Sequence, residues 1–144
     1  MTRQTSSGEP DLGLEDEEPY IGVILSAKVV PPTKLHPDWS PSVEVDFELR
    51  QGGKLRDWVP TYLNVKGGGP SKLRQLCNAI AGEPKDAEMW FDPDTLEWGY
   101  DLDSETSAAY LTLIKAVGLP VQFRGETPKD KRYRITSYRK APKG

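Results

Sequence analysis

The sequence predicts a mainly β protein, a five-stranded barrel-like domain with a helix between the third and fourth strands. Stretches that alternate apolar and polar residues recur along the chain, as is typical of strands with one buried face. A single well-bounded helical stretch interrupts them at residues 71–82. With 13 glycines and 13 prolines among 144 residues, turns are frequent, which favours a small barrel or sandwich over a helical bundle.

The chain divides into a polar tail, residues 1–18, and a single domain, residues 19–144. The tail contains one basic residue and six acidic ones and lacks apolar periodicity. Such a composition predicts a disordered acidic tail. The alternative is an acidic arm that occupies a basic groove of its own protein.

Three strands are expected before the helix. Residues 20–30 form the first, with Gly22 marking a bulge or a close backbone approach. Residues 42–50 alternate strictly, and a Gln-Gly-Gly hairpin turn connects them to residues 54–63. In this third strand either Asp57 or Arg56 and Trp58 would face the core, so a bulge is predicted and the direction of Trp58 stays open.

The helix is bounded by clear signals at both ends. Ser71 can accept a hydrogen bond from a backbone N–H of the first turn. Gly82 suits a left-handed C-terminal residue, and Pro84 prevents continuation. The apolar stripe of this helix consists of Leu73, Leu76, Cys77 and Ile80.

The second half contains an insert and two more strands. Residues 83–106 are acidic and aromatic and could form a short hairpin whose rings pack over the barrel end. Helical spacing predicts a second short helix over 107–117, with a strand start at 111–113 as the alternative. The last strands are expected at 119–126 and 131–140. Simple alternation puts Arg132, Arg134, Thr136 and Tyr138 on one face of the last strand.

This layout of three strands, a helix and two strands is that of an OB-fold barrel. The runs G-P-S-K-L-R-Q-L (69–76), A-I-A-G (79–82), V-G-L-P-V-Q-F (117–123) and K-R-Y-R-I (131–135) resemble the small OB-fold proteins of bacteriophages and actinobacterial mobile elements. The resemblance covers residues 20–141 except the acidic insert, and it brings no catalytic residues. It implies binding of single-stranded DNA.

The charges are segregated along the chain. Residues 50–76 contain six basic residues and one acidic residue, and residues 121–144 contain eight and two, whereas residues 85–106 contain one lysine and eight acidic residues. Cations that follow phosphates and aromatic faces that stack on bases bind single strands. The predicted nucleic-acid-binding residues are Lys34, Trp39, Lys54, Arg56, Trp58, Tyr62, Lys66, Lys72, Arg132, Tyr133, Arg134, Tyr138 and Arg139.

Purely structural interpretations of the same residues stay open. Trp58 and one tyrosine could belong to the core, and the basic run of the last strand could be a solvated edge that discourages strand addition. The glycine-rich loop before the helix lacks the nucleotide-binding P-loop spacing and is either a connector or a flexible loop over a groove.

The composition argues against several other functions. With one histidine and one cysteine, the sequence offers no nucleophilic triad, no metal cluster and no disulfide, so we expect neither an enzyme nor a cofactor. No apolar run is long enough for a membrane span, and a cytoplasmic protein is expected. The expected partner is single-stranded DNA, or RNA, with a replication or recombination protein as a second partner. The alternative function is protein docking through 83–106.

Overall fold

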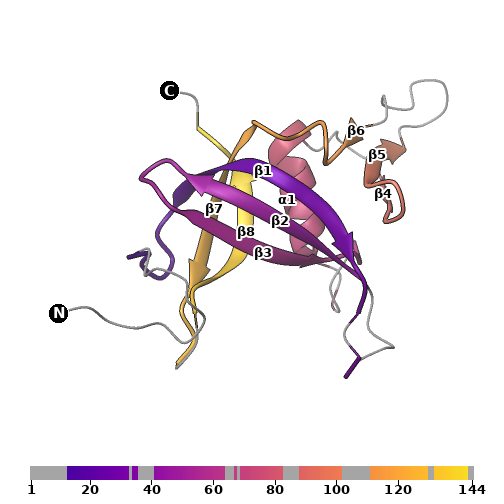
Figure 1. The fold of residues 1–144 in the computed structure, drawn as a ribbon. Helices are drawn as coiled ribbons and strands as arrows, with labels where there is room; N and C mark the ends of the chain where they lie inside the picture. The colour runs from indigo at the N-terminus through magenta and orange to yellow at the C-terminus, as the bar shows by residue number, and fades with distance from the viewer. Residues whose placement is uncertain are drawn as a thin grey trace.

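A computed structural model describes residues 13–32, 34–35, 41–63, 67, 69–82, 88–101, 111–129 and 132–142. Within these residues, strands β1 to β8 form two antiparallel sheets, and a single helix, α1, packs against the larger sheet (Figure 1). The prediction of a mainly β chain is therefore confirmed.

The larger sheet has the strand order β3-β2-β1-β7-β8. Its strands are β1 (Tyr20–Val30), β2 (Ser42–Leu49), β3 (Lys54–Pro60), β7 (Pro120–Glu126) and β8 (Arg134–Lys140). Every pairing is antiparallel. Strands β3 and β8 stand at the two ends of this order, and no strand ladder joins them in the described part of the chain. The sheet is thus not closed into a barrel.

Two local features shape the first three strands. A Cβ atom on Gly22 would lie 3.1 Å from Phe47 Cβ, so this glycine allows the close approach that the sequence suggested. The register between β1 and β2 shifts between Ile24 and Ser26. Between β2 and β3 it is continuous, so the bulge predicted in the third strand is wrong; Asp57 is instead buried.

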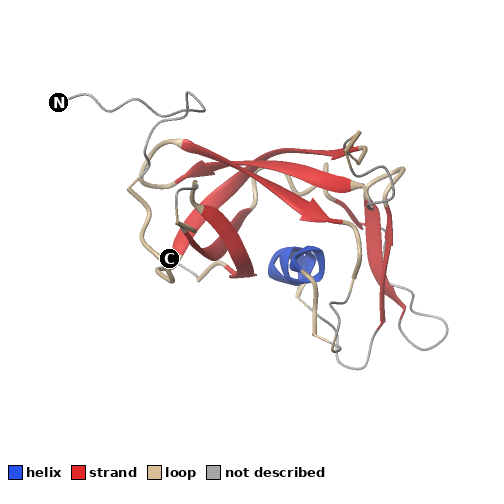
Figure 2. Cartoon of the chain, turned by 90° about the horizontal axis from the view of Figure 1, so that it is seen from below, coloured by secondary structure: helices blue, strands red, loops and turns tan. Residues whose placement is uncertain are grey.

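Helix α1 (Lys72–Ala81) begins and ends where its caps predict. The Ser71 hydroxyl accepts a hydrogen bond from Arg74 N, and Gly82 adopts a φ of 79°. Leu73, Leu76 and Cys77 are fully buried. Figure 2 looks nearly along the helix and shows strands on three sides of it, which places the core between α1 and the sheet.

The acidic insert forms the predicted hairpin. Strands β4 (Glu88–Asp92) and β5 (Glu97–Asp101) pair antiparallel, and β6 (Leu111–Thr112) adds a third strand beside β5. Trp98 and Tyr100 are buried, and the Tyr100 hydroxyl donates to Asn78 Oδ1 on α1. This side of the hairpin thus belongs to the core.

The second helix predicted over 107–117 is not observed at residues 111–117. Residues 111–112 are strand β6, which agrees with the alternative, and residues 113–118 form turns. The local backbone hydrogen bonds within these turns join residues three apart, for example Lys115 N to Thr112 O at 3.0 Å. The Thr112 hydroxyl also accepts from Lys115 N, as an N-cap side chain does, but Gly118 N donates to Ile24 O on β1, so the turns do not continue into a helix. Residues 107–110 lie outside the described residues.

The last strand does not follow the simple alternation. Arg124 pairs with Ser137 and Gly125 with Ile135, so Thr136 is an extra residue in β8. Such a bulge reverses which side chains face inward. Tyr138 is therefore buried on the same side as Ile135, and its predicted place on the face of Arg134 is wrong.

Candidate nucleic-acid interface

The outer face of β3 carries Trp58, whose direction, toward the core or toward solvent, the sequence left undecided. Trp58 is 44% exposed, and Tyr62, just beyond the strand, is 49% exposed. Asp57 and Val59 point inward and are buried. Trp58 is therefore a surface residue, and two of the predicted stacking rings have accessible faces.

Carboxylates of β2 neutralise the cations beside Trp58. Facing pairs across the two strands are Glu44 with Trp58, Asp46 with Arg56, and Glu48 with Lys54. Arg56 Nε lies 2.6 Å from Asp46 Oδ1 and 3.4 Å from Glu44 Oε1, and Lys28 Nζ lies 3.5 Å from the same Glu44 oxygen. This face thus combines exposed rings with nearly balanced charge.

The Arg56–Asp46 pair predicts a response to acid. The hydrogen bond from Arg56 lowers the pKa of Asp46 below its ordinary 3.8, against the opposing effect of burial. A lowered folded-state pKa gives stability that is present above the unfolded pKa and is lost as the pH falls through the folded pKa. Between about pH 5 and about pH 3, we expect Asp46→Asn to lose less unfolding free energy than wild type, by under ~1 kcal/mol. Urea unfolding at each pH measures this difference. An Asp46→Asn curve parallel to that of wild type would contradict the prediction.

Lys72 and Tyr138 lie in the seam between β3 and β8, where Lys72 is partly buried and Tyr138 is buried. Lys72 Nζ donates to Asp57 Oδ1 at 2.8 Å and to Ile135 O at 3.0 Å. The Tyr138 hydroxyl donates to Asp57 Oδ2, and burial, followed by the charge of Asp57, raises its pKa. Gln75 Oε1 accepts from Tyr138 N at 3.1 Å. Helix side chains and one buried carboxylate thus connect the strands that no ladder joins, and both predicted contact residues are structural.

Strand β8 carries three basic residues that are not neutralised by carboxylates of the described residues. Arg134, Arg139 and Lys140 are exposed, and within the described residues none of the three is in an ion pair. Arg132 is exposed just before the strand. These cations are the strongest electrostatic candidates for phosphate contacts.

Tyr133 is only half-buried but is not free to stack. Its ring lies 6.3 Å from that of Phe123, in an edge-to-face arrangement, and its hydroxyl is buried without a hydrogen-bond partner among the described residues. Burial, followed by nearby negative groups, raises its pKa. The ring would need its surroundings to move before it could meet a base.

The remaining predicted residues are placed as follows. Lys34 and Lys54 are exposed, whereas Trp39 and Lys66 lie outside the described residues. Arg124 is a further basic residue, not among those predicted, that pairs in register with Ser137 of β8; its Nε atom is buried without a hydrogen-bond partner in the described structure. Alternation within 120–126 could have placed it on the outer side of β7.

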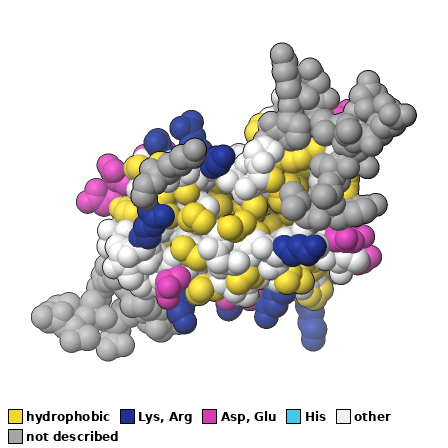
Figure 3. All heavy atoms as spheres, turned by 90° about the horizontal axis from the view of Figure 1, so that it is seen from above, with side chains coloured by type: hydrophobic (Ala, Val, Ile, Leu, Met, Phe, Trp, Pro, Cys, Tyr) yellow, Lys and Arg dark blue, Asp and Glu magenta, His cyan; other side chains and the backbone are white. Residues whose placement is uncertain are grey.

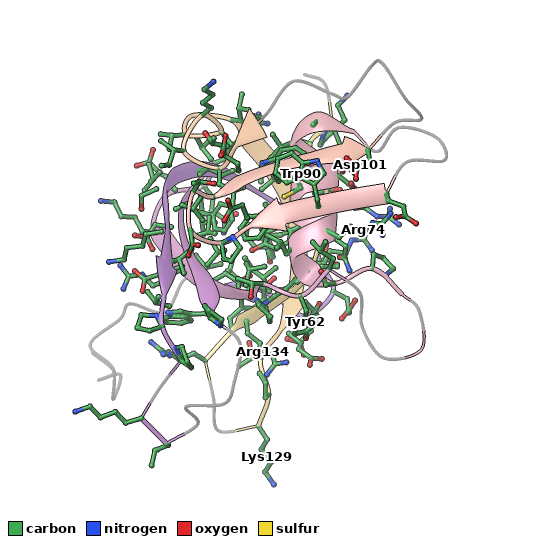
Figure 4. All side chains as sticks on the ribbon, turned by 90° about the vertical axis from the view of Figure 1, so that its right-hand side faces the viewer. Tyr62, Arg74, Trp90, Asp101, Lys129 and Arg134 are labelled. Atoms are coloured by element: carbon green, nitrogen blue, oxygen red, sulfur yellow. The ribbon has the colours of Figure 1, made fainter. Side chains whose placement is uncertain are left out.

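Two views of the side chains show how the charges are distributed. On the face in Figure 3, Lys and Arg side chains are scattered among Asp and Glu and do not form one patch. Figure 4 shows Trp90 and Asp101 at one end of the view and Arg134 and Lys129 at the other, so the acidic hairpin is remote from the basic β7–β8 turn.

No helix in the described ranges is long and apolar enough to cross a membrane. Among the same residues, no three His, Cys, Asp or Glu side chains are grouped to hold a metal ion. Comparisons with family models, curated protein sequences and solved structures find no match to this chain.

Proposed function

We propose that this chain is an OB-fold-like protein that binds single-stranded DNA with little sequence preference. The order β3-β2-β1-β7-β8, with α1 between β3 and β7, supports the fold part of the proposal because an OB-fold is a five-stranded, partly open barrel. In such folds the second and third strands, with the loops after the first and fourth, bind oligonucleotides. Here these elements are β2, β3 and residues 31–41 and 127–133.

The observation that carries the proposal is the pair of exposed rings, Trp58 and Tyr62, on and just after β3. Stacking of bases on aromatic rings contributes about 1–3 kcal/mol per base and tolerates any sequence. Because the cations beside Trp58 are balanced by β2, the electrostatic part of binding falls to the basic β8 side. Low specificity follows from this combination of stacking and phosphate contacts.

The biological setting belongs to the same proposal. Binding of single strands fits replication or recombination of a phage or mobile element, as the sequence resemblance implies. An RNA strand offers the same phosphates and base faces, so a comparison of DNA and RNA oligonucleotides is part of the test.

Trp58→Ala is expected to weaken binding of an unstructured oligothymidylate by about 5- to 150-fold, because one stacking ring is lost. Replacing both Arg134 and Arg139 by Ala should lower the slope of log affinity against log salt by about 1.4. Fluorescence titration at several salt concentrations measures both effects.

Trp90→Ala is the matched control, since it removes a partly exposed tryptophan from the acidic hairpin and should leave oligothymidylate binding unchanged. Salt-independent or undetectable binding of the wild-type protein would disprove the proposed function.

A second candidate function rests on the outer face of the β4–β5 hairpin. Glu88 faces Asp101 and Asp92 faces Glu97 across the strands, and like charges in this position are destabilising. Between these two pairs, the Trp90 ring lies over Gly99, where a Cβ atom would be 2.9 Å from it. Carboxylates around a tryptophan can attract the cationic side chains of a lysine- or arginine-rich protein segment and place one of them over the indole ring. In the titrations above, this function would make Trp90, and not Trp58, the residue required for binding a basic peptide.

A further inference from the structure

The acidic segment of residues 13–18 is seated on the end of the β7–β8 pair. Glu17 N donates to Gly125 O at 2.8 Å, and Asp16 Oδ1 accepts from Thr127 N at 2.9 Å. The Tyr20 hydroxyl accepts from Glu15 N at 2.8 Å. This part of the predicted tail is thus anchored by backbone contacts, whereas residues 1–12 lie outside the described residues.

The seat lies next to Tyr133, one of the predicted stacking residues. Gly125, whose carbonyl accepts from Glu17, is so close to Tyr133 that a Cβ atom on it would be 2.7 Å from the phenol oxygen. The charges of Asp16 and Glu17 contribute to the raised pKa of Tyr133, after burial and Tyr20. The acidic segment therefore stands beside the ring that lies between Arg132 and Arg134.

The segment offers the charge and hydrogen-bonding groups of a nucleic-acid strand. It carries four consecutive carboxylates, residues 15–18, all exposed, and its hydrogen bonds to Gly125 and Thr127 hold it at the β7–β8 end. The Asp16 carboxylate accepts a backbone N–H of Thr127, as a phosphate oxygen would. Glu17 adopts a φ of 62°, a conformation that is uncommon for a residue other than glycine and that the contacts on both sides hold.

We propose that the acidic segment 13–18 competes with nucleic-acid phosphates for the β7–β8 end and restrains binding there. This inference rests on the proposed function and adds its regulation. With the segment seated, the Thr127 N–H is occupied and the Tyr133 side chain is half-buried. A single strand that displaces the segment can accept a hydrogen bond from the Thr127 N–H, contact the neighbouring cations and stack on the Tyr133 ring.

The test removes the charges of the segment and keeps its length. In the variant Glu15→Gln, Asp16→Asn, Glu17→Gln and Glu18→Gln, affinity for oligothymidylate is expected to rise about tenfold, because four competing carboxylates of modest individual effect are lost. The control variant removes four charges from the remote hairpin: Glu88→Gln, Asp92→Asn, Glu97→Gln and Asp101→Asn. A larger gain in the segment variant than in the control supports the competition.

A second measurement reports on the seat itself. Asp16→Ala should accelerate hydrogen exchange of the Thr127 amide, and in the wild-type protein saturating oligothymidylate should shift the amide resonances of Glu17 and Thr127. Equal affinity in wild type and both variants, or equal gains in both variants, overturns the competition and leaves the proposed function standing. Absence of binding in every variant overturns both.

Discussion

Asp57→Ala is expected to lower the free energy of unfolding by about 2–4 kcal/mol, because it leaves the buried Tyr138 hydroxyl and the partly buried Lys72 ammonium without their shared partner. Lys72 Nζ would keep only the carbonyl of Ile135, and the Tyr138 hydroxyl would lose its acceptor. Equilibrium urea unfolding, followed by tryptophan fluorescence, measures the loss.

The control for this prediction is an exposed ion pair. Asp46→Ala breaks the contact with Arg56 on the outer face, and its cost should stay under about 1 kcal/mol because solvent screens that pair. The triple variant Asp57→Leu, Lys72→Met and Tyr138→Phe should recover most of the stability, since it replaces the whole hydrogen-bonded group by apolar side chains and leaves no buried hydroxyl without an acceptor. An Asp57→Ala variant as stable as Asp46→Ala would show that the seam does not depend on this carboxylate.

Gly125→Ala is expected to cost at least about 2–3 kcal/mol, because the bulged end of β7–β8 has no room for a side chain. The added Cβ atom would lie 2.2 Å from Arg134 O and 2.6 Å from Tyr133 Cζ. Relief requires the backbone to move, which would separate the strands next to the acidic segment. Thermal and urea unfolding measure this cost.

Two further variants identify the cause. Gly22→Ala meets side-chain atoms at 3.1–3.3 Å, which can shift, so its cost should be clearly smaller. Adding Tyr133→Ala to Gly125→Ala removes the ring contact but keeps the clash with Arg134 O, so we expect little recovery. Full recovery in the double variant would place the clash in the ring and contradict the role given to the backbone.

Local signals made much of the fold predictable. The first strand, the capped helix and the hairpin of 88–101 appear where alternation, capping residues and turn residues indicate them. Each of these signals lies within a few residues of the element that it defines. The helix predicted over 107–117 is absent at residues 111–117 because its apolar spacing also suits a short strand followed by turns, and the pairing with β5 favours the strand.

Features that depend on distant partners were not predictable in the same way. The inward position of Asp57 looked unfavourable until Lys72 and Tyr138 supplied its partners. The direction of Tyr138 depends on Thr136, an extra residue that only the pairing with β7 reveals.

The candidate site shows the same division. The exposed ring of Tyr62 and the cations Arg134 and Arg139 were predictable from the sequence. Basic side chains of an alternating strand are rarely buried, and Tyr62 lies at the end of its strand. Neutralisation of Arg56 was not, because it depends on the register that sets it opposite Asp46. For Lys72, a basic residue at a helix start gave no sign that it reaches a strand 63 residues further on.

The seam between β3 and β8 also predicts an order of folding events. Asp57 and Lys72 are 15 residues apart and can meet early, whereas the contact from Asp57 to Tyr138 spans 81 residues. Contacts of such long separation form late because the loop between them must first be closed. On a growing chain, the first three strands and the helix are complete before β8 has been synthesised. The ion pair between Asp57 and Lys72 can therefore form without β8. The hydrogen bond from Tyr138 to Asp57 can form only after the last strand has been added, when the domain is complete.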